Sequence, residues 1–182
     1  NYVDCVKLLM DAGCDSCIMT KTKSTAIVIA AQEGYNKIVK LLLPSSYSQL
    51  FKAAYLTASH GEVEILQTLL GKKGLLHFEK KKRAMFLSKC LDAATKAQSV
   101  PCIRVLASQG INLNQRELDE CVEFAATEDY AECMRALLDS GASRKVAKKA
   151  ARSAASEKCL EVLRKNKKKG FIKGCLLYTS PS

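Results

Sequence analysis

The sequence predicts an all-α protein, a solenoid of stacked antiparallel helix pairs. A phrase in which cysteine precedes apolar residues at helical spacing occurs four times, beginning at Cys5, Cys102, Cys133 and Cys159. Pairs of small residues lie upstream of most of these phrases, at intervals of 25 to 36 residues. This period is typical of arrays in which each unit buries its apolar face only against its neighbours.

Composition and length are consistent with a folded array. The chain has 182 residues, of which 48% are hydrophobic and 26% charged, so it is too apolar for a disordered polymer. No apolar run approaches the roughly 20 residues that cross a bilayer, and residues 1–13 lack the pattern of a secretory signal. We expect an intracellular protein, cytoplasmic or nuclear, and read the opening inside the repeat pattern, without an initiator Met, as a fragment.

The inner helix of each unit is predicted around a pair of small residues, because small side chains let two helices approach closely. These pairs are Ala30-Ala31, Thr57-Ala58, Ala93-Ala94, Ala125-Ala126 and Ala150-Ala151. The outer helix is predicted at the leucine-rich phrase that follows, whose larger side chains fill the space between layers. These phrases lie at residues 5–9, 38–43, 102–106, 133–138 and 159–163. Two of them stop at Gly13 and Gly141, as short helices do.

The nine cysteines fit this pattern better than a disulfide framework. Secreted disulfide proteins carry their cysteines in loops, whereas most of these recur inside apolar helical phrases. We therefore expect reduced thiols in the core.

One unit resembles the ankyrin repeat, whose family order is hairpin, inner helix and outer helix. The matching segments are Gly13 to Cys17, Ser24 to Tyr35 and Ile38 to Leu43. Asp15, Thr25 and Gly34 match the hairpin Asp, the helix-starting Thr and the inter-helix Gly of the family. Lys23, Ala26 and Val28 stand where the family has Gly, Pro and His.

The resemblance implies an ankyrin-type solenoid over residues 1–166. It would contain five to six units, the first of them truncated. Later units keep the helices better than the hairpins, which are expected to be short or degenerate. An enlarged basic connection at 71–83 interrupts the array, as either a solvated linker or a binding insertion. Residues 167–182 are a basic end and a tail that is non-native or disordered, because 174–182 resemble a translated vector tail.

The sequence offers little for catalysis, so we expect no enzyme. It has two histidines, His60 and His77, and neither has a recognisable partner nucleophile nearby. Cys14 and Cys17 form a lone CxxC without the second ligand pair that zinc needs. Gly71 to Gly74 lacks the spacing of a phosphate-binding loop. We expect neither a metal nor a cofactor.

The resemblance implies a protein-binding groove, formed by the hairpin tips and the solvent side of the inner helices. We expect this protein to bind a partner protein there. The candidate residues are Lys21, Thr22, Ser24, Gln32, Glu33, Ser59, His60, Thr95, Lys96, Thr127 and Glu128.

The net charge of +11 leaves a second interpretation open, binding of a polyanion such as nucleic acid or an anionic membrane. The excess charge lies in residues 72–83, with 6 basic and 1 acidic residues, and in residues 144–182, with 12 and 2. A solubilising polar cap on the last unit explains the second run equally well. The candidate basic patch is Lys80, Lys81, Lys82, Arg83, Lys145, Lys148, Lys149, Arg164, Lys165, Lys167, Lys168 and Lys169.

Overall fold

The computed structural model describes residues 2–43, 47–71, 80–108 and 115–165. The chain divides into two compact units, residues 1–114 (unit 1) and 115–182 (unit 2), and each is described by itself. Every regular element in the described ranges is a helix, and the helices pack in sequential pairs. The predicted all-α architecture of antiparallel helix pairs is confirmed.

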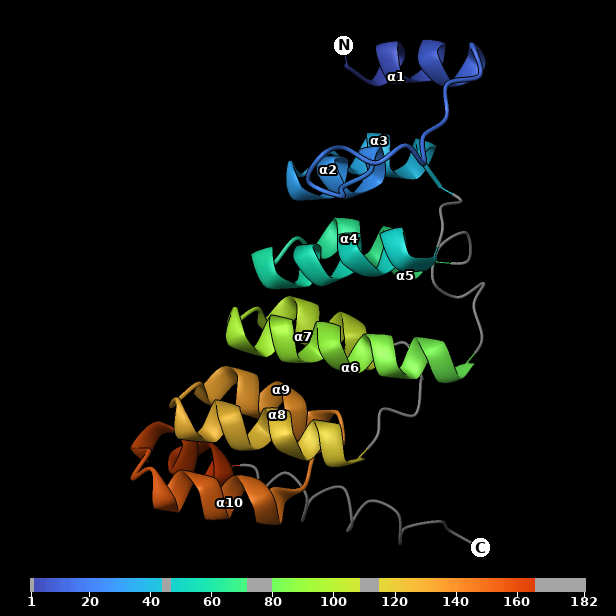
Figure 1. Cartoon of the computed structure of the whole chain (residues 1–182). Coiled ribbons are helices and arrows are strands. Elements are labelled where there is room, and N and C mark those ends of the chain that lie inside the picture. The colour runs from blue at the N-terminus through green and yellow to red at the C-terminus, as the bar shows by residue number, and fades with distance from the viewer. Residues whose placement is uncertain (1, 44–46, 72–79, 109–114, 166–182) are drawn as a thin grey trace, which may run out of the picture. The chain divides into compact units, whose positions relative to one another are not determined.

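Unit 1 contains two layers of helices (Figure 1). The inner layer places α2 (Ala26–Gln32), α4 (Tyr47–His60) and α6 (Lys80–Lys96) side by side. The outer layer is formed by α1 (Tyr2–Asp11), α3 (Asn36–Leu41), α5 (Val63–Leu70) and α7 (Val100–Ser108). Each inner helix also packs on the outer helix that follows it. Contacts within a pair and contacts between neighbouring pairs therefore both stabilise the stack.

Unit 2 repeats this arrangement on a smaller scale. Its helices are α8 (Gln115–Thr127), α9 (Ala131–Asp139) and α10 (Arg144–Ser153), and residues 157–165 are also helical. The inner helix α8 packs against its outer partner α9 and against the next inner helix α10.

The expected connection at 71–83 is shorter than the sequence suggested. Helix α6 begins at Lys80, so the last four residues of that segment are its first turn. Residues 72–79, like the end of the chain at 166–182, lie outside the described residues. The start of α6 could not be predicted from the lysine run, because lysine is a good helix former and does not mark a helix boundary.

The same turn joins the inner helix to the outer helix in each described pair. One residue adopts a left-handed conformation, and the amide of the next residue bonds to a carbonyl five positions back, as in a Schellman motif. The left-handed residues are Gly34, Gly61, Gln98, Asp129 and Ala155, with φ between 52° and 79°. The closing bonds run from Tyr35 to Ala30, Glu62 to Thr57, Ser99 to Ala94, Tyr130 to Ala125 and Ser156 to Ala151, at 2.8 to 3.0 Å.

These turns define which residues are equivalent in successive units. The acceptor carbonyls belong to Ala30, Thr57, Ala94, Ala125 and Ala151, all of which are buried. In three units, the first residue of the small-residue pair is the one whose carbonyl accepts the closing bond. In the other two units, the pair begins one residue earlier, at Ala93 and at Ala150. This offset is invisible in sequence, since either member of an Ala pair satisfies the same pattern.

Large side chains fill the core, and the leucine-rich phrases contribute to it through fully buried residues such as Ile103 and Leu137. Phe86 on α6 is fully buried, and its ring meets Phe51 of α4 edge-on at 4.7 Å between centroids. Cys102, Cys133 and Cys159 are buried, but Cys5 is exposed, which corrects its assignment to the core. Helix α1 packs on α3 and has no buried residue, so Leu8 and Leu9 remain 70% and 55% exposed.

Candidate functional site

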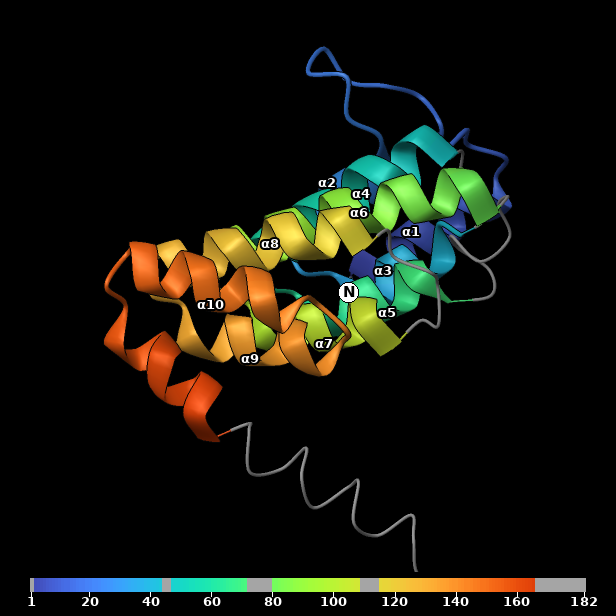
Figure 2. The ribbon, with the colours of Figure 1, turned by 90° about the horizontal axis from the view of Figure 1, so that it is seen from below.

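The hairpin before α2 presents two of the predicted binding residues. Its turn is closed by the Lys23 amide bonding to the Thr20 carbonyl at 2.9 Å, and Lys23 takes a left-handed φ of 54°. Lys21 and Thr22 lie at the tip and are exposed. The loop between α1 and α2 projects beyond the helices in Figure 2.

The neighbouring inner helix braces this hairpin. Lys52 Nζ on α4 donates hydrogen bonds to the Lys23 carbonyl and to Ser24 Oγ, both at 3.0 Å. Thr25 Oγ1 donates to Gln49 Oε1, also on α4, at 2.9 Å. These contacts join residues 24 to 29 positions apart, so they fix the hairpin tip relative to the inner layer.

The C-terminal ends of the inner helices form one row in unit 1. Gln32, Ser59 and Lys96 each lie two positions after the aligned small residue, on α2, α4 and α6. Gln32 and Lys96 are exposed and Ser59 is half-buried. Glu33 and His60 follow them and are exposed at the turns, where His60 Nδ1 lies 2.7 Å from the Leu56 carbonyl.

A second row lies one helical turn before the first. Ile29, Tyr55 and Asp92 stand three or four residues before Gln32, Ser59 and Lys96, so each pair shares a helix face. Ile29 is 41% exposed and Tyr55 39%, both large apolar groups open to solvent. Asp92 bonds Lys96 at 2.8 Å. We call these six residues the inner-helix surface.

Sequence reasoning missed the second row of this surface. The small-residue pairs, from which the first row was predicted, mark only the end of each inner helix. Apolar residues such as Ile29 and Tyr55 were assigned to packing. The helical spacing from Gln32 and Ser59 back to Ile29 and Tyr55 was the available signal.

Two predicted groove residues, Thr95 and Ser24, are buried and cannot face a partner. Thr95 is fully buried, and its hydroxyl donates to the Leu91 carbonyl. It was chosen because it follows an Ala pair, but the turn aligns it with the buried Ala31 and Ala58. Ser24 is 7% exposed beneath the hairpin and accepts from Lys52. Thr127 and Glu128 hold the aligned, exposed positions, and they belong to unit 2.

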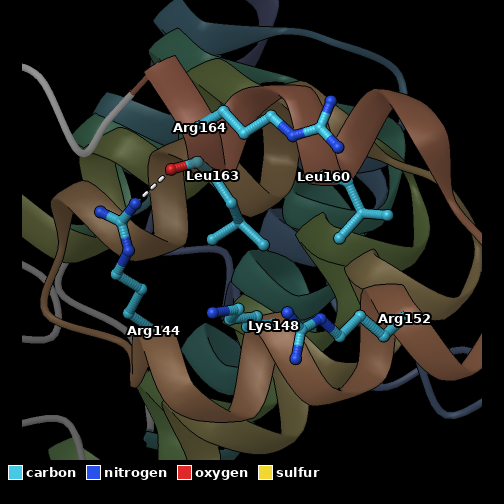
Figure 3. Close-up of a pocket in the computed structure, with 6 residues that line it drawn as sticks. All are labelled: Arg144, Lys148, Arg152, Leu160, Leu163 and Arg164. Atoms are coloured by element: carbon cyan, nitrogen blue, oxygen red, sulfur yellow. Dashed lines mark hydrogen bonds between the residues drawn. The ribbon is translucent and has the colours of Figure 1, made fainter.

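A basic pocket lies in unit 2, between α10 and the helix at 157–165 (Figure 3). It has a volume of about 300 Å³ and is lined by Arg144, Lys148, Arg152, Leu160, Leu163 and Arg164. The Arg144 guanidinium donates a hydrogen bond to the Leu163 carbonyl, which ties the start of α10 to the other helix. The side chains of Lys148 and Arg152 lie along α10, and Leu160 and Leu163 extend from the facing helix.

The structure divides the predicted basic patch. Lys148 and Arg164 line the pocket, whereas Lys145 and Lys149 are exposed on α10 outside it. Lys165 instead pairs with Glu161 at 2.6 Å, and this contact lowers the pKa of that carboxyl. Arg83 is half-buried on α6 in unit 1.

The remaining members of the predicted patch are not described. The side chains of Lys80, Lys81 and Lys82, and the whole of Lys167, Lys168 and Lys169, lie outside the described residues. Arg144 and Arg152 were left out of the patch although their spacing of four from Lys148 places all three on one helix face.

The cysteines separate into exposed and packed groups. Cys14 and Cys17 are exposed in the hairpin, where the Cys17 amide bonds to Asp15 Oδ1 at 2.7 Å. Burial raises the pKa of the Cys90, Cys102, Cys133 and Cys159 thiols, which keeps them protonated and unreactive.

The described part of the chain has neither a side-chain cluster suited to a metal ion nor a helix suited to crossing a membrane. There, no cluster of three or more His, Cys, Asp or Glu side chains is placed to hold a metal ion. None of the described helices combines the length and apolar character that crossing a bilayer requires.

Comparison with known proteins identifies the N-terminal part of the chain. Residues 1–83 match a family model described as ankyrin repeats, in 3 copies. No curated protein and no solved structure matched the chain. The resemblance predicted from residues 13–43 is therefore confirmed for residues 1–83, and its extension to residue 166 stays a prediction.

Proposed function

Because residues 1–83 are ankyrin repeats, which generally serve as protein–protein interaction modules, we propose that this protein is a non-catalytic module that binds a partner protein. The partner contacts the inner-helix surface and the hairpin tip of unit 1. The observation that carries this proposal is the pair of exposed apolar side chains, Ile29 and Tyr55, on adjacent inner helices.

The composition of this surface favours a protein over a polyanion. Ile29 and Tyr55 supply an apolar centre, and an aromatic anchor of this kind commonly dominates binding energy. The charges around it have mixed sign, since Lys96 is paired with Asp92 and Glu33 is exposed beside Gln32. Polyanion binding would require a surface of one sign.

The surface is also held rigidly before a partner arrives. The Lys52 and Thr25 hydrogen bonds fix the hairpin to α4, and the Phe51–Phe86 contact fixes α4 to α6. A rigid surface loses little conformational entropy on binding, which favours affinity.

The test compares Tyr55→Ala with Tyr35→Ala in the whole chain. Tyr35 is 45% exposed in the turn before α3, and its ring lies 6.3 Å from that of Tyr2 on the outer helix α1. Proteins retained from nuclease-treated lysate at high salt are identified by mass spectrometry, and circular dichroism confirms that both variants fold.

We expect Tyr55→Ala to lose proteins that the unmodified chain and Tyr35→Ala retain. With a purified partner, the loss in binding free energy should be about 2 kcal/mol or more, as for an interface anchor. Retention of the same proteins at the same affinity by Tyr55→Ala would overturn the proposal.

A further inference from the structure

We propose that the basic pocket of unit 2 binds a compact anion that carries two or more phosphate groups. The site lies on α10 and residues 157–165, apart from the inner-helix surface, and it stands or falls independently of the proposed function.

Helix α10 carries a row of positive charges that lines the pocket. Arg144, Lys148 and Arg152 are spaced by four residues and share one face of the helix. Like charges at this spacing repel each other and destabilise a helix, whereas an anion between them reverses the effect. Arg164 adds a fourth positive charge from the facing helix.

Protein counter-charges are scarce around this pocket. Several cations on other helix surfaces pair with an acid three or four residues away, as in Lys96–Asp92, Arg116–Glu120, Arg135–Glu132 and Lys165–Glu161. Helix α10 contains no acidic residue, and no carboxylate lines the pocket. Among the described residues, Lys148 and Arg152 have no ion-pair partner, so their charge is available to a ligand. Arg164 forms no ion pair either, although its charge helps Lys165 to lower the pKa of Glu161 on the same helix.

The pocket matches phosphate groups in shape and in charge. Arginine presents a planar fork of donors that suits phosphate oxygens, and three of the four cations here are arginines. A phosphate monoester carries a charge of about −1.5 to −2, so two such groups balance four cations. A volume of about 300 Å³ suits a small ligand, and Leu160 and Leu163 give it an apolar wall.

A nucleic acid is a poorer fit to unit 2. A strand would follow a basic groove beyond the pocket, but the neighbouring inner helix α8 carries four acidic residues, and Glu128 follows it in the turn. The four are Glu117, Asp119, Glu120 and Glu123. In the described part of unit 2, Arg144, Lys148, Arg152 and Arg164 gather around one pocket.

The test measures binding to the full chain by isothermal titration calorimetry. The probes are inorganic tripolyphosphate and soluble inositol trisphosphate, with sulfate for comparison. A flotation assay uses phosphatidylcholine vesicles with or without a phosphatidylinositol bisphosphate. Binding of the soluble probes identifies a free phosphate ligand, and binding only to the phosphoinositide vesicles identifies a lipid headgroup.

Two double variants remove the same charge from the same helix. Lys148→Gln with Arg152→Gln empties the pocket of two cations, while Lys145→Gln with Lys149→Gln removes two exposed cations outside it. We expect the pocket variant to weaken phosphate binding about tenfold or more, as for lost charge-assisted hydrogen bonds. The matched control should change it by about twofold at most, since exposed charges are screened.

Several results would overturn the proposal. These are equal weakening by both double variants, no binding of any phosphate probe at millimolar concentration, or tighter binding of an oligonucleotide than of tripolyphosphate. Helical circular dichroism of each variant distinguishes lost binding from lost folding.

Discussion

The hydroxyl of Ser156 donates a hydrogen bond to the carboxylate of Asp129, and this bond links the turn of one helix pair to the start of the next outer helix. Ser99 and Gly61 occupy the equivalent positions in unit 1, where a Cβ on Gly61 would lie 3.3 Å from Ser99 Oγ. Successive turns are therefore in contact in both units. In unit 2 the contact is the Ser156–Asp129 hydrogen bond, and in unit 1 it is the close approach of Ser99 to Gly61.

Stability in acid should depend on Asp129. The Ser156 hydrogen bond, assisted by Lys158 at 3.6 Å, lowers the pKa of this carboxyl in the folded protein. A depressed folded pKa contributes stability above the unfolded value of about 3.9, and this contribution disappears as pH falls through the folded pKa. Asp129→Asn keeps a residue that tolerates the left-handed conformation but removes the charge.

Urea unfolding of the whole chain and of its Asp129→Asn variant, at several pH values from neutral to below 4, checks this expectation. The unmodified chain should lose more stability across the acid range than Asp129→Asn does. Parallel pH profiles for the two proteins would show that Asp129 makes no contribution.

Gly61→Asn should introduce a hydrogen bond from Ser99, equivalent to the bond that Asp129 accepts from Ser156 in unit 2. Asn provides an acceptor oxygen toward Ser99 and tolerates the positive φ of 77°. A double-mutant cycle with Ser99→Ala should give a coupling free energy of about 0.5–1.5 kcal/mol, the usual net value of a hydrogen bond. A coupling free energy of zero would mean that the Asn side chain turns away from Ser99.

Ala155→Gly and Gln98→Gly should stabilise the protein. Both residues have positive φ, 52° and 56°, which is strained for a side chain with a Cβ and free of strain for glycine. Each change should raise the free energy of unfolding by up to about 1 kcal/mol after the larger chain entropy of glycine is counted.

Gly34→Ala is the reverse control for these two changes. A Cβ at Gly34 would meet nothing within 4 Å, so the variant reports the backbone conformation alone. We expect it to destabilise by a similar amount. Lower stability of Ala155→Gly in thermal or urea unfolding would contradict the assignment of strain to these turns.

Thiol labelling should separate the cysteines by their position in the fold. Cys5, Cys14 and Cys17 are exposed, whereas Cys90, Cys102, Cys121, Cys133 and Cys159 are buried. Burial also raises the pKa of the Cys90, Cys102, Cys133 and Cys159 thiols, so little reactive thiolate forms at neutral pH.

Brief iodoacetamide treatment followed by peptide mass spectrometry checks this division. The exposed group should be modified in the native protein, and the buried group only after denaturant is added. Rapid native labelling of Cys102 or Cys133 would contradict the packing of the outer helices α7 and α9.

Local sequence patterns were sufficient to predict the helix pairs. The leucine-rich phrases at 102–106 and 133–138 lie within α7 and α9, because apolar spacing and stop signals act within a single helix. The prediction for Thr95 failed because the inner-helix register is fixed by the Gln98 turn, whose left-handed residue carries no glycine to mark it. The prediction that Cys5 lies in the core was also wrong, because the apolar face of a helix is buried only where another helix covers it.

The sequence by itself determined that this protein is a stack of helix pairs and that its positive charge is concentrated in particular segments. Only the tertiary structure decided which of those charges act together. Arg144 and Arg152 share a pocket with Arg164 because two separate helices pack, and Tyr55 and Ile29 lie on neighbouring helices because α4 packs beside α2. The periodicity of one helix determines which side chains share its face, but a binding surface requires faces from different helices, and long-range packing sets their alignment.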